Sequence, residues 1–463
     1  MNTYIERTPT TEPEPSASQS GVRGPYPSPR PLTPNPQCVE FLLQCLSTSR
    51  QPSAVGREPL AVSRQPSADW SEVVAVAADH GLTPLLYSRL KESSSQACVP
   101  ADVWERLRRA HFASAVRNMS LYGELRKVLQ RLRSSGIPVI VLKGAFLAEA
   151  VYDDVALRPM VDVDLMVPRA ELSRAHAVLV DIGRVRQQSE GIESRLRRSR
   201  ELRLSAGAGI DIHWAIVTPA SRFRLDLTGF WDRARPATIA GVEVLALSPE
   251  DLLLHLCLHT SYGHVFGEGV RPLCDIAATI RRFGGDMDWM QVAERAREWR
   301  AARYVGLTLH LARSMLGAEV PDDVLEQLVP GDIDQRVLET ARESVLARSG
   351  YGPWVPLFHL RSAKSLADKA RMFWGRIFLS RDEMAAKYPT SRGAENLGFY
   401  YVLRLRDGLR AFGAYALSRG RSRRSRRRGR RVPLTSHLES GKPTRQAELK
   451  AKADVKAEAS RAD

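Results

Sequence analysis

The residues best suited to chemistry are three aspartates in two short segments that alternate apolar and polar side chains. Asp162 and Asp164 lie in residues 161–167, and Asp211 lies in residues 210–214. This alternation is the period of a half-buried β-strand, so Asp162 and Asp164 should leave the same face of their strand. They would stand roughly 6.6 Å apart, at about 3.3 Å per residue. Asp211 adds a third carboxylate to that face if the two strands pair.

Three carboxylates on one sheet face repel one another and are costly to hold beside apolar neighbours. A divalent cation relieves that cost. Two such cations, about 3.5–4 Å apart, stabilise the attacking and leaving oxygens of a phosphoryl transfer. The three aspartates therefore predict a metal-dependent nucleotidyl transfer. A lone Asp-x-Asp pattern carries little weight, since Asp286-Met287-Asp288 repeats it where a helix is expected to begin.

The segments around the aspartates predict alternating helices and strands. A short buried strand is expected at Pro138–Leu142, followed by a turn at Lys143-Gly144. Further strands are expected near 203–205 and at 161–167, 210–216 and 242–247. Helices are expected at 38–46, 70–79, 84–90, 101–134, 145–152 and 169–182. From Ser248 onward the pattern turns helical, with a serine cap, a proline at the first position and acids in the first turn.

We therefore expect an α/β (α+β) fold, a mixed sheet with helices, flanked by N-terminal and C-terminal helical regions. The expected order is a disordered Pro/Ser-rich segment with a short helix, a helical region, the catalytic domain, a helical domain and a disordered Arg-rich tail. These parts span residues 1–68, 69–135, 136–247, 248–418 and 419–463 respectively.

Composition narrows the class of protein. The net charge is +16, but nine arginines within residues 419–431 supply much of it. The body of the chain is therefore only modestly basic. No run of 18 or more apolar residues is present, and the amino terminus lacks the apolar core of a signal peptide, so we expect a cytoplasmic protein without a membrane span. The five cysteines are scattered without a CxxC pair, so neither a disulfide framework nor a zinc-cysteine site is indicated.

The order of these motifs resembles a known family. It runs from Leu142-Lys143-Gly144 through Tyr152 and Arg158-Pro159-Met160 to the strand 161–167 and the later Ile210-Asp211-Ile212-His213-Trp214. This order is similar to the DNA polymerase β-like nucleotidyltransferase superfamily, and within it to an uncharacterised bacterial family of the LKG…R…DxDLLV…DLHW type. The similarity covers roughly residues 69–410.

The resemblance implies roles by position. Asp162 and Asp164 would ligate Mg²⁺ (or Mn²⁺), and Asp211 would ligate one metal and help to deprotonate the acceptor hydroxyl. The Lys143-Gly144-Ala145 turn and Arg158 would meet the nucleotide triphosphate. Elementary chemistry agrees, because a glycine turn admits close backbone approach and the next helix presents N–H groups to an anion. The broader superfamily has Gly-Gly or Gly-Ser at this turn, so Ala145 lacks the serine hydroxyl that would touch a phosphate.

Weaker candidates surround this core. His213 should share the face of Asp211, where it could orient that carboxylate, contact substrate, or simply pack with a hydrogen bond. His255 and His259 have the i, i+4 spacing of two metal ligands, but we favour a core position in which one of them is satisfied by hydrogen bonds. The alternative, which rests on the family pattern that His259 and Asp275 match, is that His259, Arg271 and Asp275 line the substrate side of the cleft. Together with His213 they are the second-tier candidates.

The sequence thus predicts a nucleotidyltransferase that moves an NMP from an NTP, such as ATP, to an unidentified acceptor hydroxyl. A second interpretation is an inactive nucleotide-sensing or partner-binding module of the same fold. A third is a non-specific nucleic-acid binder, because Arg419–Arg431 can contact phosphates or another anionic surface.

Overall fold

The computed structural model describes residues 35–47, 69–93, 95–183, 201–204, 209–217, 221, 223–331, 333–348, 398–406 and 410. The chain divides into two compact units, Met1–Lys369 and Ala370–Asp463, and each is described by itself. In the second unit the structure describes a helix over residues 398–406. The segments predicted to be disordered, residues 1–34, 48–68 and 419–463, lie outside the described residues.

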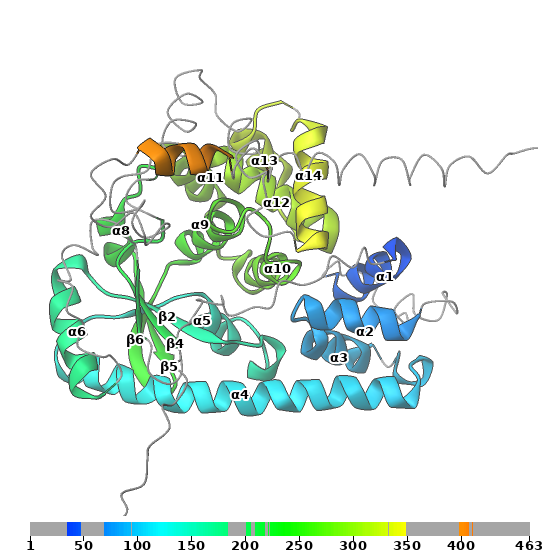
Figure 1. Ribbon diagram of the computed structural model, residues 1–463, viewed down its shortest axis with the longest axis horizontal. Coiled ribbons are helices and arrows are strands. Elements are labelled where there is room, and N and C mark those ends of the chain that lie inside the picture. The colour runs from blue at the N-terminus through cyan, green and yellow to red at the C-terminus, as the bar shows by residue number, and fades with distance from the viewer. Residues whose placement is uncertain are drawn as a thin grey trace, which may run out of the picture. The chain divides into compact units, whose positions relative to one another are not determined.

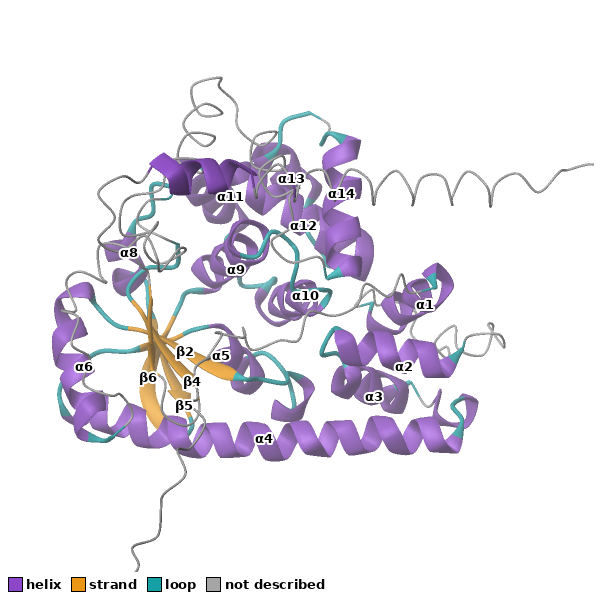
Figure 2. Ribbon diagram, in the orientation of Figure 1, coloured by secondary structure: helices purple, strands orange, loops and turns teal. Residues whose placement is uncertain are grey.

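The first unit is built around a mixed sheet. Within the described residues it has six strands in the order β3-β4-β2-β1-β6-β5. Figure 2 draws the sheet in orange. The strands are β1 (Ile140–Val141), β2 (Asp162–Met166), β3 (Glu201–Leu204), β4 (Gly209–His213), β5 (Arg235–Ile239) and β6 (Val242–Ala246). β2 pairs with β4 in parallel and β1 with β6 in parallel, whereas the β1–β2, β3–β4 and β5–β6 pairs are antiparallel. This mixed α/β architecture confirms the predicted fold class.

The helices on the N-terminal side form a layer that reaches the sheet. They are α1 (Pro36–Leu46), α2 (Trp70–Asp79), α3 (Thr83–Glu92), η2 (Ser95–Cys98) and α4 (Ala101–Ser134). The long helix α4 packs against α3 at one end and against β6 at the other (Figure 1). α2 and α4 have the predicted bounds, and Asp69 caps α2 by accepting from the N–H groups of Ser71 and Glu72. The short helix α1 also joins the core, because Phe41 and Leu42 are buried in its contacts with α2, α3 and α12.

The elements beside β2 and β4 are short. They are α5 (Lys143–Ala150), η3 (Val155–Leu157), η4 (Arg169–Glu171), α6 (Leu172–Asp181) and α8 (Leu227–Asp232). Two differences from the sequence prediction stand out. α5 begins at Lys143 instead of Ala145, so the expected turn is the first turn of the helix itself. β5 and α8 were not predicted. Pro236 argues against a strand in the sequence, but β5 is an edge strand, where a missing N–H is tolerated.

The C-terminal side is helical, as expected. Its elements are α9 (Pro249–Leu258), the π-helical turn η5 (His259–Gly263), α10 (Arg271–Phe283), α11 (Trp289–Glu298), α12 (Ala302–Leu316), α13 (Asp322–Leu328) and α14 (Gln335–Ala347). Ser248 caps α9 as predicted, since its side chain accepts from the Asp251 N–H. α9, α10 and α12 pack on one another and place η5 beside the sheet's aspartates. Among the described helices, none combines the length and apolar character needed to cross a bilayer.

Candidate active site

The three aspartates meet on one face of the sheet. β2 and β4 pair in parallel with Asp164 opposite Asp211, and Asp162 lies opposite Gly209. Because Asp162 and Asp164 are two residues apart on one strand, all three carboxylates project from the same face. The opposite face of both strands is apolar and buried through residues such as Val163 and Ile210. The alternating pattern read from the sequence therefore places the acids together, and all three line one pocket.

Two basic side chains hold Asp164. The Lys143 Nζ lies 3.1 Å from Asp164 Oδ1, and His213 Nε2 lies 2.6 Å from the same oxygen. His213 is only 2% exposed. It shares the face of Asp211, but its contact is diagonal, to Asp164 on the neighbouring strand. Burial alone would raise the pKa of Asp164, but Lys143 and His213 outweigh it and hold that pKa well below its usual range. Asp164 is therefore ionised at neutral pH.

Lys143 takes an unusual backbone conformation to reach this position. Its φ is +36°, a left-handed value that a non-glycine residue adopts at a cost of order 1–3 kcal/mol. It is also buried, at 9% exposure, directly after the β1 strand. Strain of this kind persists where the surrounding structure fixes it, and it concentrates at functional sites.

Gly144 is required by its neighbour Arg158. A Cβ on Gly144 would come within 2.7 Å of the Arg158 Nη1 and 3.2 Å of the Met160 Sδ. The next residue, Ala145, is fully buried, and its carbonyl accepts a 2.7 Å hydrogen bond from the Tyr122 hydroxyl. Ala145, which stands where the broader superfamily has glycine or serine, is therefore packed away from solvent.

A buried ion pair joins the sheet side of the pocket to the helical side. Arg158 donates to both carboxylate oxygens of Asp275 at 3.0–3.2 Å, and the Tyr152 hydroxyl donates to Asp275 Oδ1 at 2.9 Å. Burial would lower the pKa of Arg158, but Asp275 outweighs it and the net shift is upward. Burial, and then Asp275, raise the pKa of Tyr152 well above its usual value.

One amide side chain makes three hydrogen bonds to the loop that carries Arg158. Asn118 of α4 is fully buried. Its Nδ2 donates to the carbonyls of Val155 and Arg158 at 2.6 and 2.9 Å, and its Oδ1 accepts from the Met160 N–H at 3.2 Å. The sequence offered no signal for this role, because Asn118 lies within an otherwise ordinary amphipathic helix.

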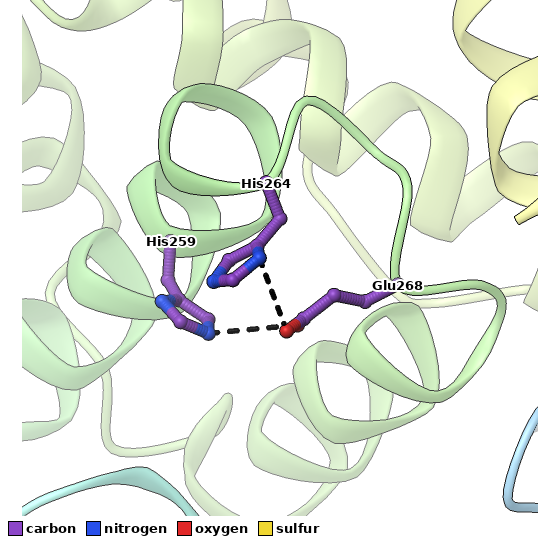
Figure 3. A group of neighbouring side chains, drawn as sticks. All are labelled: His259, His264 and Glu268. Atoms are coloured by element: carbon purple, nitrogen blue, oxygen red, sulfur yellow. Dashed lines mark ion pairs between the residues drawn. The ribbon is translucent and has the colours of Figure 1, made fainter. Parts of the chain in front are cut away.

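The far wall of the pocket comes from η5 and the residues after it. Two of the sequence candidates, His259 and Arg271, line the pocket together with His264 and Glu268, which the sequence analysis did not single out. The His259 Nε2 lies 3.5 Å from Glu268 Oε2, and the His264 Nδ1 lies 3.2 Å from Glu268 Oε1 (Figure 3). Arg271 donates from Nη1 to the Pro159 carbonyl at 3.4 Å.

The helical turn explains why His264 escaped notice. The His264 N–H bonds to the His259 carbonyl at 3.0 Å, five residues back, which is the π-helical pattern. This wider turn brings residues five apart onto one face. Regular helix spacing instead paired His259 with His255 in the sequence. A π-turn has no reliable sequence signature, so the His-x₄-His spacing was the one available clue.

His255 does not behave as a satisfied core histidine. It is 2% exposed, and neither ring nitrogen has a hydrogen-bond partner among the described residues. Burial, followed by Lys143 and His259, lowers its pKa well below the usual value. The sequence led us to expect one histidine of this pair to be satisfied by hydrogen bonds; among the described residues His255 has no such partner, whereas His259 Nε2 lies 3.5 Å from Glu268 Oε2. His255 is a neutral, buried ring.

The charges on the far wall are also set by burial. Burial and the nearby Lys143 lower the pKa of His259 to about 3, so this ring is neutral at physiological pH. Burial would raise the pKa of Glu268, but its contacts with His259 and His264 outweigh it, and the net pKa is lowered. His259 therefore presents a neutral imidazole to the pocket, and Glu268 presents an ionised carboxylate.

The structure thus gathers most of the predicted site residues around one pocket. The residues that line it are Lys143, Gly144, Arg158, Asp162, Asp164, Asp211, His259, Arg271 and Asp275. His213 reaches the same cluster through Asp164, and Ala145 is buried in α5 behind it.

Comparison with known proteins gives a family. The family described as "Uncharacterised nucleotidyltransferase" matches residues 66–317, which is more than half of the chain. No curated protein matches. Among solved structures, the chain is similar to the solution structure of the antibiotic-resistance factor ANT(2'')-Ia, with 17% identity and a TM-score of 0.28, over 42% of this chain and 97% of that one. The family match confirms the resemblance seen in the LKG and DxD motifs, and the chain belongs to this nucleotidyltransferase family.

Proposed function

We propose that this chain transfers a nucleoside monophosphate from an NTP to an acceptor hydroxyl and releases pyrophosphate. The observation that carries the proposal is the in-register pair Asp164 and Asp211, with Asp162 on the same face and Lys143 in the same pocket. Like charges directly opposite each other on neighbouring strands are destabilising. Carboxylate oxygens are also the donors that Mg²⁺ and Mn²⁺ prefer. The residues present therefore fit a divalent-metal site.

In this proposal Asp162, Asp164 and Asp211 hold Mg²⁺ or Mn²⁺. The ions would supply charge neutralisation at the phosphates and lower the pKa of a bound hydroxyl. Asp211 would accept the proton of the acceptor hydroxyl. The acceptor oxygen then bonds to the α-phosphorus while the bond from the α-phosphorus to the bridging oxygen breaks, and pyrophosphate departs with that electron pair.

The phosphates would be held on the α5 side of the pocket. Lys143 begins α5, so its ammonium and the first N–H groups of that helix offer positive charge to a triphosphate. Arg158 would add charge from a fixed position beside Gly144, because Asp275 holds its guanidinium from the other side. Catalysis would come mainly from positioning and electrostatic stabilisation. We place the reaction in the cytoplasm, where NTPs are available.

The test is turnover with each of the four α-labelled NTPs and Mg²⁺ against a panel of hydroxyl-bearing acceptors, including the protein itself. Asp162→Asn and Asp164→Asn should keep the fold and lose Mg²⁺-dependent label transfer. Asp286→Asn is the matched control, because Asp286 belongs to the other Asp-x-Asp pattern and is exposed, outside the pocket lining. Full activity in both pocket variants would refute the mechanism.

The second candidate function is an inactive nucleotide-binding module. Ala145 favours it, since this position offers no hydroxyl to a phosphate and is fully buried. The intact trio of aspartates favours the enzyme. Binding of Mg-NTP without turnover across the acceptor panel would support the module.

A third candidate rests on the Arg419–Arg431 tail, whose phosphate contacts would give salt-sensitive, sequence-independent binding of nucleic acid. Truncation before Arg419 should weaken binding of RNA or DNA at low salt and leave turnover unchanged. If truncation leaves that binding intact, the tail has no part in it. Insensitivity of the binding to Asp162→Asn would separate it from the catalytic pocket.

A further inference from the structure

The strongest feature that the proposed reaction leaves unused is a cluster of two histidines and a glutamate on the far wall of the pocket. Figure 3 shows His259, His264 and Glu268 directed toward one point. Their candidate ligand atoms all lie within 4.8 Å of one another. The two histidine nitrogens stand 3.5 and 3.2 Å from oxygens of the Glu268 carboxylate.

A π-helical turn and the strained turn after it bring these side chains together. The π-helical turn places His264 beside His259, and their rings lie 4.4 Å apart between centroids. The chain then turns sharply through Val265 and Phe266, whose φ values are +48° and +60°. Such left-handed conformations are unfavourable for non-glycine residues, above all for a β-branched valine. The turn returns the chain so that Glu268 faces the two rings.

Packing holds this strained turn in place. Val265 and Phe266 are buried, and the Phe266 N–H bonds to the Thr260 carbonyl at 2.8 Å. The Val270 N–H bonds to His80 Nδ1 at 3.1 Å, which anchors the far end of the turn to the α2–α3 junction. Strain of about 1–3 kcal/mol per residue is retained when the surroundings fix the conformation, and it clusters at ligand-binding sites.

The donor set differs in kind from the three aspartates. Two imidazole nitrogens and one carboxylate favour zinc and other late first-row transition metals, whereas a site made only of oxygens favours magnesium. Bonds of about 2.0–2.2 Å in a tetrahedral zinc site separate the ligand atoms by about 3.3–3.5 Å. The two histidine nitrogens stand 3.5 and 3.2 Å from different oxygens of Glu268, and one donor atom from each residue lies within 4.8 Å of the other two. Small side-chain movements would therefore bring the three donors to the spacing of a metal site.

We propose that His259, His264 and Glu268 form a binding site for Zn²⁺ or a chemically similar divalent transition metal, separate from the aspartate trio. Three protein ligands leave a fourth position for water or a substrate oxygen, as in catalytic zinc sites. The site lines the same pocket as the three aspartates. If the proposed nucleotidyl transfer holds, this open position would bind an oxygen of the acceptor and so select acceptors with a metal-binding hydroxyl or carboxylate.

The test uses the full chain, stripped with a chelator and kept in millimolar Mg²⁺ so that the aspartates are saturated. Equilibrium dialysis against Zn²⁺ should give one bound ion per chain. Titration with Co²⁺ should give the intense visible bands of a four-coordinate site. Since even outer-shell partners are worth about 10–100-fold in metal affinity, losing a direct ligand should weaken binding by at least about 100-fold.

The variants are His264→Gln and Glu268→Gln, which preserve size and polarity. His264 has 31% of its side chain exposed, so its replacement should be tolerated by the fold, and circular dichroism checks this. His310→Gln is the matched control, because His310 lies in α12 outside the pocket lining. Asp162→Asn should abolish turnover yet keep the zinc site, so failure of the enzyme proposal and failure of the metal proposal give different results.

Substoichiometric Zn²⁺ binding would overturn the proposal and leave the trio as a hydrogen-bonded His–Glu–His cluster. Stoichiometric binding that survives both His264→Gln and Glu268→Gln would also overturn it, since the metal would then lie elsewhere.

Discussion

The buried pair of Arg158 and Asp275 offers a quantitative test of how the pocket is held together. The Asp275 side chain is 4% exposed and the Arg158 side chain is 12% exposed. Removing one partner leaves an uncompensated buried charge, which typically costs about 3–5 kcal/mol. We therefore expect Asp275→Asn to lower the free energy of unfolding by about 3 kcal/mol, at the lower end because asparagine can still accept one hydrogen bond.

The double variant separates the pair from its surroundings. Arg158→Met alone should cost a similar amount, because it strands the Asp275 carboxylate. Arg158→Met combined with Asp275→Asn removes both charges, and the remaining penalty is chiefly the weaker acceptor left for the Tyr152 hydroxyl, about 1–3 kcal/mol. The double variant should therefore be less destabilised than the sum of its parts by about 3 kcal/mol or more.

Urea unfolding at pH 7, followed by circular dichroism, measures each free energy. Glu243→Gln is the matched control, since the Arg133–Glu243 pair is exposed on both sides, at 58% and 74%. That change should cost less than about 1 kcal/mol. Asp275→Asn behaving like Glu243→Gln, or additivity of the double variant within about 0.5 kcal/mol, would show that Arg158 is not held as the geometry indicates.

Three further perturbations have defined outcomes. His80 accepts from the Val270 N–H, and burial followed by Arg348 lowers its pKa from 6.5 to about 4. Because the folded state resists protonation of His80, its contribution to the free energy of unfolding is fully present above pH 6.5 and is lost as the pH falls toward 4. Urea titrations should show a loss of about 2 kcal/mol between pH 7 and 5. His80→Gln should remove this pH dependence. Asn118→Asp keeps the shape but loses both donors, so thermal unfolding should report a loss of about 2–4 kcal/mol; an unchanged melting temperature would contradict the assigned hydrogen bonds. Gly144→Ala should displace Arg158 and cost about 1–3 kcal/mol, but much less in an Arg158→Met background, and equal costs in both would rule out the proposed clash.

The sequence located the parts of the site that obey a simple period. Alternation in 161–167 and 210–214 placed Asp162, Asp164 and Asp211 on one face, and the parallel register of β2 and β4 agrees. The Ser248 cap was also visible, because capping depends on residues within one helical turn. These features depend only on residues that are close together in the sequence, so the sequence alone predicts them.

The parts that escaped depend on contacts between distant residues or on irregular backbone. Arg158 and Asp275 are 117 positions apart in the sequence. The sequence analysis identified both as candidates but could not show that they form an ion pair. His213 shares the face of Asp211, as expected, but the sequence did not show that its ring also reaches Asp164 on the neighbouring strand. β5 was not predicted because it contains Pro236, and a proline is tolerated in a strand mainly at the edge of a sheet.

The charges around Asp164 stabilise Lys143 in its unfavourable left-handed backbone conformation. Asp164 and Asp211 face each other on adjacent strands, and the Lys143 Nζ lies 3.1 Å from Asp164 Oδ1. A divalent metal on that carboxylate would compete with Lys143 for the same oxygen. The released ammonium would then be available to an incoming triphosphate at the start of α5. Metal and nucleotide would thus favour each other's binding through one side chain, and by linkage the effect must be equal in both directions.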